Sequence, residues 1–289
     1  MRNTIQIATT IDESYVQHLG VMLCSLFESN PFNHLSIFVF SKRISSTQVR
    51  KLKKLAYRYD GDITIIEINE SQIQNLKLNL HASVANYYRL LMADLLPNYL
   101  RKILYLDSDI IFKTDIGELW QTDVSEYYVA AVAEPFYDCS YLGFASEDKY
   151  FNSGVMLINL DKWRKEEIGE TTINFIEQNP DKIKMWDQDG LNVVLKGKWL
   201  ELPQQWNQTS RIFEQNPFTI PSIIHYTGSL KPWNYHCQHP LKSEYFHYLK
   251  KTPWRKFHFK EDTVWHKVKQ SLKKSVNKVS GKKMFEIYA

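Results

Sequence analysis

Along the first part of the chain, short apolar runs alternate with segments in which apolar residues recur at helical spacing. Four short apolar runs have the length and composition of buried strands: residues 5–10, 35–40, 63–68 and 102–106. Between them, three segments place apolar side chains at the spacing of amphipathic helices: residues 14–29, 45–59 and 84–95. Alternation of this kind predicts an α/β fold with a mostly parallel sheet flanked by helices.

The pattern is less regular in the second half. Apolar runs at 129–133 and 155–159 predict two more strands, and beyond about residue 200 frequent prolines indicate a loop-rich stretch. Residues 263–279 have apolar side chains at helical spacing among lysines. We therefore expect two parts, a domain over residues 1–250 and a basic amphipathic tail over residues 251–289.

Charge is distributed unevenly along the 289 residues, whose net charge is +4. From Lys250 onward the chain has 12 Lys/Arg against 3 Asp/Glu, so residues 1–249 carry a net −5. Three singly spaced cysteines argue against a disulfide framework. The chain shows no signal-peptide pattern and no apolar stretch of the roughly 20 residues that span a bilayer, which predicts a cytoplasmic protein.

The acidic triplet Asp107-Ser108-Asp109 directly follows the apolar run at 102–106. Ligands bind at the carboxyl ends of strands in open α/β sheets. Residues i and i+2 of a strand point to the same side, so both carboxylates can reach one hard cation such as Mn²⁺ or Mg²⁺. Acidic triplets are also common at turns, but a surface turn rarely needs such an apolar run before it.

Four ordered blocks of the sequence resemble glycosyltransferase family 8, over residues from about 5 to 233. They are Tyr87–Leu90 with Lys102–Asp109, then Phe151–Leu160, Trp186–Asn192 and His225–Trp233. The resemblance implies a GT-A type, Rossmann-like fold with a small loop-rich and helical C-terminal part. It also implies a retaining, Mn²⁺-dependent transfer of hexose from UDP-galactose or UDP-glucose, with Mg²⁺ as the alternative metal.

The resemblance also implies roles for individual residues. Asp107, Asp109 and His225 would coordinate the metal, although His225 taken alone fits an ordinary buried histidine better. Residues matching the family's donor-binding positions are Ala8, Thr9, Asp12, Tyr15, Ser108, Gly228 and Lys231. Within that set Gly228 and Lys231 would bind the diphosphate, whereas Tyr15 would either stack on uracil or pack at the start of a helix.

The catalytic set implied by the family match is Arg89, Asn152, Asp187 and Gln188. Arg89 would contact the donor sugar, although an arginine on a helix is commonly a solvated surface charge. Gln188 stands at the expected nucleophile position, yet an amide is a poor nucleophile. We therefore expect front-side attack, in which the leaving phosphate takes the proton of the acceptor.

Competing functions remain open from the sequence. A nucleotidyltransferase would need a Gly-rich loop near the first strand, where residues 5–20 contain only Gly20. A non-catalytic sugar-nucleotide-binding partner of an active transferase, or a self-glucosylating protein, is the other alternative. The expected acceptor is a bacterial surface glycan such as lipooligosaccharide, lipopolysaccharide or a glycoprotein glycan.

The basic tail predicts peripheral contact with the inner face of the plasma membrane. Its aromatic residues would insert at the headgroups while lysines meet anionic lipids: Trp254, Phe257, Phe259 and Trp265. A solvated helix packed on the domain is the alternative. Nothing else in the sequence supports nucleic-acid binding.

Overall fold

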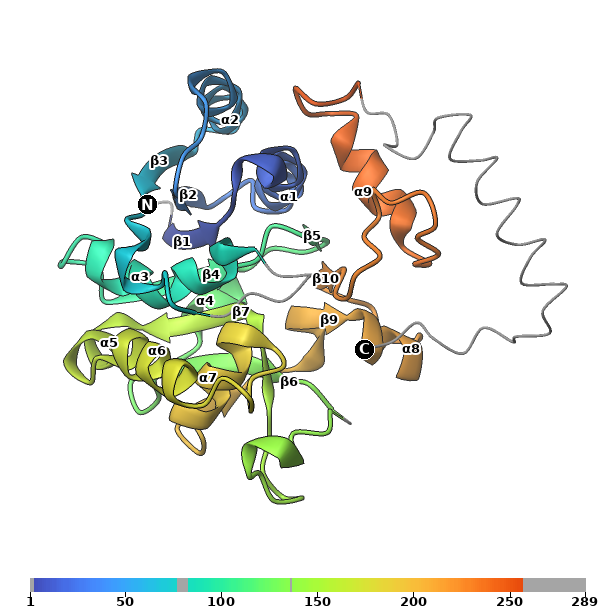
Figure 1. Cartoon of the computed structure of the whole chain (residues 1–289). Coiled ribbons are helices and arrows are strands. Elements are labelled where there is room, and N and C mark those ends of the chain that lie inside the picture. The colour runs from blue at the N-terminus through green and yellow to red at the C-terminus, as the bar shows by residue number, and fades with distance from the viewer. Residues whose placement is uncertain (1–2, 77–82, 136, 257–289) are drawn as a thin grey trace, which may run out of the picture.

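A seven-stranded sheet forms the centre of the structure, a computed structural model that describes residues 3–76, 83–135 and 137–256. The strand order is β3-β2-β1-β4-β7-β6-β8 (Figure 1). The strands are β1 (Thr4–Thr10), β2 (His34–Ser41), β3 (Asp62–Glu67), β4 (Lys102–Leu106), β6 (Val129–Ala133), β7 (Phe151–Asn159) and β8 (Trp199–Glu201). β7 pairs antiparallel with β4 and β6, whereas the other neighbours are parallel. The predicted α/β fold with a mostly parallel sheet is confirmed.

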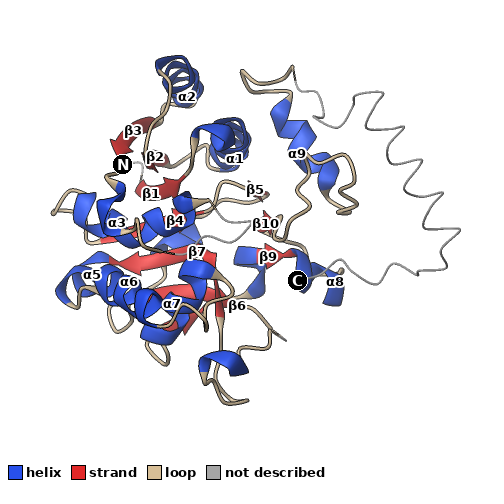
Figure 2. Cartoon of the chain, viewed as in Figure 1, coloured by secondary structure: helices blue, strands red, loops and turns tan. Residues whose placement is uncertain are grey.

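Helices cover both faces of this sheet, as Figure 2 shows. One hydrophobic core lies between the sheet and α1 (Val16–Ser29) and α2 (Ser46–Arg58). A second core lies on the opposite face, under α3 (Tyr88–Leu95), α5 (Leu160–Lys165), α6 (Ile168–Gln178) and α7 (Trp186–Val194). Ile7 of β1 enters the first core and its neighbour Ala8 enters the second. Burial on both faces explains why these strands are continuous apolar runs rather than alternating ones.

Element boundaries differ from the sequence-based expectation in several places. Short 3-10 turns, Glu13–Tyr15 and Val84–Tyr87, form the first part of the helices expected from residues 14 and 84. β7 begins four residues earlier than expected, because Phe151 pairs with Ala133 and all four residues from Phe151 to Gly154 are buried. Helices α5, α6 and α7 were not predicted.

A second, three-stranded sheet has the order β5-β10-β9 and consists of very short strands. They are β5 (Ile110–Phe112), β9 (Gln208–Thr209) and β10 (Ile223–His225). β10 runs antiparallel to β5 and parallel to β9. This sheet carries two distant segments of the chain, 204–209 and 223–225, to the carboxyl end of β4. The remaining elements are α4 (Gly117–Gln121), α8 (Ser210–Gln215), α9 (Lys242–Leu249) and the 3-10 turns Glu70–Gln72, Ser140–Leu142 and Gln204–Asn207.

The chain after α9 packs back onto α1. Trp254 is 8% exposed, and a Cβ added to Gly20 of α1 would lie 2.3 Å from Cζ3 of its indole ring. Its Nε1 donates to Oε1 of Gln48 on α2 at 3.0 Å. The expectation that Trp254 inserts into a membrane is therefore wrong, because its ring is buried in the domain.

The other expectations for the tail concern residues outside the described ranges. These are the helix over 263–279 and the aromatic residues Phe257, Phe259 and Trp265. The proposed division at residue 250 stays a prediction. Within the described ranges, no helix combines the length and the apolar character needed to cross a membrane.

Candidate active site

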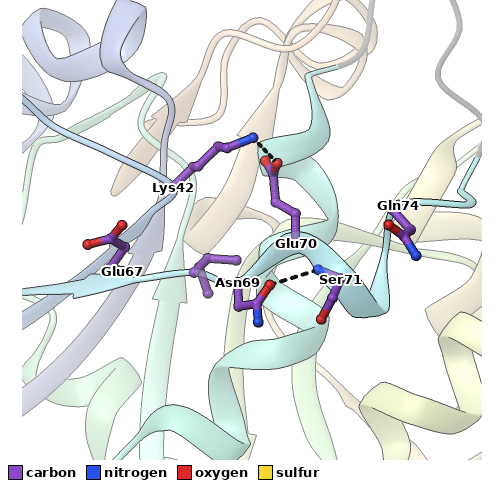
Figure 3. A pocket seen from close by; sticks show the side chains of 7 residues that line it. Lys42, Glu67, Asn69, Glu70, Ser71 and Gln74 are labelled. Atoms are coloured by element: carbon purple, nitrogen blue, oxygen red, sulfur yellow. Dashed lines mark hydrogen bonds and ion pairs between the residues drawn. The ribbon is translucent and has the colours of Figure 1, made fainter.

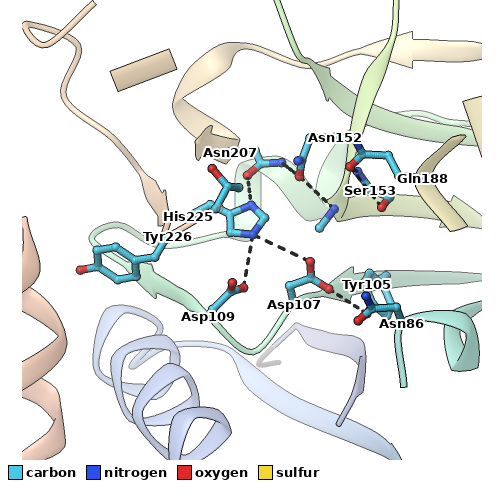
Figure 4. Close-up of polar contacts among 12 residues, drawn as sticks. Asn86, Tyr105, Asp107, Asp109, Asn152, Ser153, Gln188, Asn207, His225 and Tyr226 are labelled. Atoms are coloured by element: carbon cyan, nitrogen blue, oxygen red, sulfur yellow. Dashed lines mark hydrogen bonds and ion pairs between the residues drawn. The ribbon is translucent and has the colours of Figure 1, made fainter. Parts of the chain in front are cut away.

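The acidic triplet lies at the turn between β4 and β5. Asp107 follows the buried strand β4, and Asp109 precedes Ile110, which pairs with His225 at the end of β10. Nε2 of His225 lies 3.2 Å from Oδ1 of Asp109 and 3.8 Å from Oδ2 of Asp107 (Figure 4). One potential ligand atom from each of these residues lies within 4.8 Å of the others. Asp107, Asp109 and His225 thus form a compact triad of two carboxylates and one imidazole.

A chain of side-chain amides orients His225. Nδ1 of the imidazole is 2.8 Å from Oδ1 of Asn207, and because that oxygen can only accept, Nδ1 carries the proton. Nδ2 of Asn207 in turn donates to Oδ1 of Asn152 at 2.9 Å. Nε2 is therefore the nitrogen that faces the carboxylates and that can offer a lone pair to a metal. Histidine ligands of metals are oriented in this way, so the triad fits Mn²⁺ or Mg²⁺ in a mixed N/O set.

Gly154 in β7 leaves the space that the triad occupies. A Cβ at this position would lie 2.3 Å from Cε1 of His225 and 2.7 Å from Oδ2 of Asp107. The backbone is held here, because N–H of Asp107 donates to the Gly154 carbonyl at 2.8 Å and N–H of Gly154 donates to Oδ1 of Asn152 at 3.0 Å. Any larger residue would displace one of the triad side chains.

Arg89 of α3 is buried and joins two carboxylates. Its Nη2 lies 3.0 Å from Oδ1 of Asp107, and its Nε lies 3.1 Å from Oδ2 of Asp187. Its guanidinium also lies over the ring of Tyr105, 4.5 Å from the centroid. Burial alone would lower the pKa of Arg89, but Asp107 and Asp187 raise it above its ordinary value. The alternative of a solvated surface arginine is wrong, because only 4% of the residue is exposed.

The N-terminal turn of α7 brings Asp187 and Gln188 next to β7. Oε1 of Gln188 accepts from the N–H of Ser153 at 3.0 Å, and its Nε2 donates to the hydroxyl of Tyr150 at 3.1 Å. Both side chains are buried. Burial raises the pKa of Asp187 to about 6, although Arg89 opposes this shift. The amide of Gln188 is therefore held on both sides, which suits an orienting role better than a mobile one.

Lys231 lies beside the triad on the loop after β10. Its Nζ is 2.5 Å from Oδ2 of Asp109 and donates to the carbonyl of Tyr226 at 2.7 Å. Burial would raise the pKa of Asp109, but Lys231 and His225 hold it well below its usual range. Gly228 is exposed and has φ of 85°, a left-handed conformation that favours glycine. The loop thus places the positive charge of Lys231 at the triad.

The expected donor-base residues near the end of β1 differ in their accessibility. Ala8 and Thr9 are fully buried, backbone included, so the structure exposes neither residue to a ligand. Asp12 accepts from the N–H of Ser14 at 2.9 Å and caps the first 3-10 turn. Tyr15 packs edge-on against the ring of Trp233, with centroids 5.8 Å apart. Ser108, which lies between Asp107 and Asp109 in sequence, is also buried.

Two further polar residues at the site were missed from the sequence. Asn207 lies in the proline-rich stretch, where no pattern distinguishes it. Glu134 follows β6, accepts from the hydroxyl of Thr209 at 3.0 Å, and has a pKa raised by burial. An acid directly after an apolar strand is the same signal that Asp107 gives, so Glu134 was open to prediction.

A surface pocket lies beyond the end of β3, apart from the triad (Figure 3). Its lining is polar and includes Lys42, whose Nζ pairs with Oε2 of Glu70 at 2.5 Å. The hydroxyl of Tyr88 donates to the other oxygen of Glu70 at 2.5 Å. The Lys42–Glu70 pair is satisfied within the protein and holds the 3-10 turn at Glu70 against α3.

Comparison with known proteins identifies one family and several related sequences. Residues 6–237 match the family model for glycosyl transferase family 8. General stress protein A of Bacillus subtilis is 32% identical over 86% of this chain and 94% of its own length. Lipopolysaccharide 1,2-glucosyltransferase of Escherichia coli K12 is 28% identical over 87% of this chain and 79% of its own length.

Solved structures give the same result. The crystal structure of the galactosyltransferase LgtC in complex with donor and acceptor sugar analogues superposes with a TM-score of 0.79 at 25% identity. The alignment covers 86% of this chain and 96% of that one. The family resemblance expected from the four sequence blocks is confirmed.

Proposed function

The chain belongs to glycosyltransferase family 8, and we propose that it transfers galactose or glucose from a UDP-sugar to a bacterial surface glycan with retention of configuration. The observation that carries the proposal is the triad of Asp107, Asp109 and His225 beside Lys231. The names of its relatives, a lipopolysaccharide glucosyltransferase and a galactosyltransferase, support the classes of donor and acceptor. The acceptor would be lipooligosaccharide, lipopolysaccharide or a glycoprotein glycan.

In this proposal the triad holds Mn²⁺, with Mg²⁺ as the alternative. A divalent ion bound there supplies positive charge that stabilises the departing diphosphate. Lys231 adds a second positive charge, and the backbone at Gly228 approaches the phosphates closely. The uridine lies toward the end of β1, near Ala8, Thr9 and Ser108 and against the side chains of Asp12 and Tyr15.

The donor hexose lies between Arg89 and the polar residues Asn152, Asp187 and Gln188. We propose front-side attack: the acceptor hydroxyl forms the new bond to the anomeric carbon as the bond to UDP breaks, and its proton passes to the leaving phosphate. The fixed amide of Gln188 stabilises the positive charge that develops on the anomeric carbon. Trapping of a hexosyl adduct on Asp187 by mass spectrometry, together with loss of turnover in Asp187→Asn, would refute this route.

The decisive experiment measures UDP release from a panel of UDP-sugars with Mn²⁺ present and after chelation. We expect release from UDP-galactose or UDP-glucose that requires the metal and that disappears in Asp109→Asn. Metal-independent release contradicts the proposal. The alternative, a non-catalytic sugar-nucleotide-binding partner, predicts that UDP-sugar binds in calorimetry without any turnover by the wild-type chain, even with acceptor glycan present.

The tail over residues 251–289 completes the proposal. Its lysines would hold the enzyme at the inner face of the plasma membrane, where lipid-linked acceptors lie. Flotation with liposomes, comparing the full chain with one ending at Pro253, tests this. Equal flotation of the two forms removes the tail from the membrane contact.

A further inference from the structure

The helix α2 carries an unusual concentration of positive charge. Residues 42–58 contain seven Lys/Arg and no Asp/Glu. Residues 1–249 have a net charge of −5 although they include this +7 segment, so the rest of them carries −12. Within α2, Leu52, Leu55 and Ala56 are buried. The buried face fixes the helix on the domain and turns its cations to the outside.

The exposed cations of α2 follow one stripe. Arg50, Lys53, Lys54 and Arg58 are exposed and occur at the three- and four-residue spacing that places side chains on one helix face. In the described part of the chain, none of them forms an ion pair with a carboxylate. Tyr57, in the middle of the same stripe, is 87% exposed. Such a face is not explained by packing or by pairing within the protein.

The end of the described chain extends this stripe. Nη1 of Arg58 donates to the carbonyl of Lys251 at 3.0 Å, and the buried Trp254 donates to Gln48 and lies under Nζ of Lys51, 5.5 Å from the ring centroid. The same turn exposes two more cations next to α2, Arg255 and Lys256. Segments about 200 residues apart in sequence are thereby joined into one positive surface.

We propose that this surface is a docking site for an anionic lipid bilayer. We call it the basic face, and it consists of Arg50, Lys53, Lys54 and Arg58 of α2 with Arg255 and Lys256. Its charge complements anionic headgroups, and Tyr57 offers an aromatic ring of the type that prefers the headgroup region. The sequence after Lys256 contains eight more Lys/Arg against three Asp/Glu.

Lipid fits this surface better than nucleic acid does. Proteins that bind single strands combine positive charge with several aromatic platforms in a groove. Here the cations lie on the outer face of a helix, with a single exposed tyrosine among them. The outward cations of α2 suit the charged surface of an anionic bilayer instead. The basic face does not include the metal triad, so its test is independent of the proposed sugar transfer.

The test is co-sedimentation of the full chain with vesicles. The probes are phosphatidylcholine vesicles with and without phosphatidylglycerol, at low and high salt. The variant R50Q/K53Q/K54Q removes three charges from the basic face, and the control K165Q/K182Q/K198Q removes three exposed charges from the α5–β8 side of the domain. All proteins retain the tail, so its contribution is shared. Melting curves show whether each variant is folded.

We expect the basic-face variant to lose roughly a hundredfold in partitioning onto the anionic vesicles at low salt, and the control to lose little. The difference should shrink at high salt, where the charges are screened. Equal partitioning of the two variants overturns the proposal, as does equal binding of the wild-type chain to neutral vesicles. Binding to a single-stranded oligonucleotide without binding to anionic vesicles overturns it as well.

Discussion

Replacing Gly154 with alanine tests the proposed metal site without removing Asp107, Asp109 or His225. The added Cβ would meet Cε1 of His225 at 2.3 Å, whereas ordinary contacts begin at 3.4 Å. The backbone cannot yield easily, because β7 pairs with β4 on one side and with β6 on the other. The imidazole must therefore move by about 1 Å, which is far more than the ~0.2 Å tolerance of metal–ligand distances.

We expect Gly154→Ala to weaken Mn²⁺ binding by at least ~10–100-fold, the usual effect of disturbing a ligand's support. Overpacking should also cost about 1–3 kcal/mol of folding free energy. Calorimetric titration with Mn²⁺ and a denaturant melt measure the two effects separately.

A matched control exists in α1. Gly20→Ala places a Cβ 2.3 Å from Cζ3 of Trp254, the same overlap at a distance from the triad. It should lower stability by a similar amount and leave Mn²⁺ affinity unchanged. If Gly154→Ala bound Mn²⁺ as tightly as the wild-type chain, the triad would not be the metal site.

Three other substitutions probe the same site. Asn207→Leu should weaken Mn²⁺ binding ~10–100-fold in calorimetry, because His225 loses the acceptor that fixes its tautomer. Lys231→Met should weaken UDP binding by about tenfold or more in the presence of Mn²⁺; an unchanged UDP affinity would exclude Lys231 as a diphosphate ligand. The pKa of Asp187 is raised from 3.8 to about 6, so the folded protein binds this proton more tightly than the unfolded chain does. The protonated carboxyl therefore stabilises the fold at low pH, and this stabilisation is lost as the pH rises through 6. Asp187→Asn should lack this loss, about 2 kcal/mol between pH 4 and 7, in denaturant melts. Parallel curves for the two proteins would contradict the shift.

The strand-and-helix alternation and the acidic triplet were readable from the sequence for a physical reason. Strands buried on both faces become apolar runs, and β4 is such a run that ends at Asp107. That contrast between an apolar strand and two carboxylates is local, so a single segment contains it. The helices α5 to α7 were not predicted, although the buried side chains of α6, Ile168, Thr172, Ile173 and Ile176, follow helical spacing.

The partners of the triplet were not readable in the same way. His225 reaches Asp109 only because β10, three residues long, pairs with β5 across more than a hundred residues. Strands of two or three residues are too short for any periodicity to show. The family blocks indicated His225, but neither composition nor spacing indicated Asn207. For Trp254 the sequence pattern was misleading. An aromatic residue beside lysines suggested a membrane anchor, but its ring packs against Gly20 in the domain.

Charge balance connects the triad to the donor. Among the described residues, the three acids Asp107, Asp109 and Asp187 form ion pairs with two permanent cations, Arg89 and Lys231. Each cation neutralises part of the set, which permits the burial of these carboxylates but leaves an excess negative charge when all three are ionised. A divalent ion reverses the sign of the site, and a diphosphate then finds a net positive environment. Metal and nucleotide should therefore bind with positive coupling, each raising the affinity for the other by the same factor.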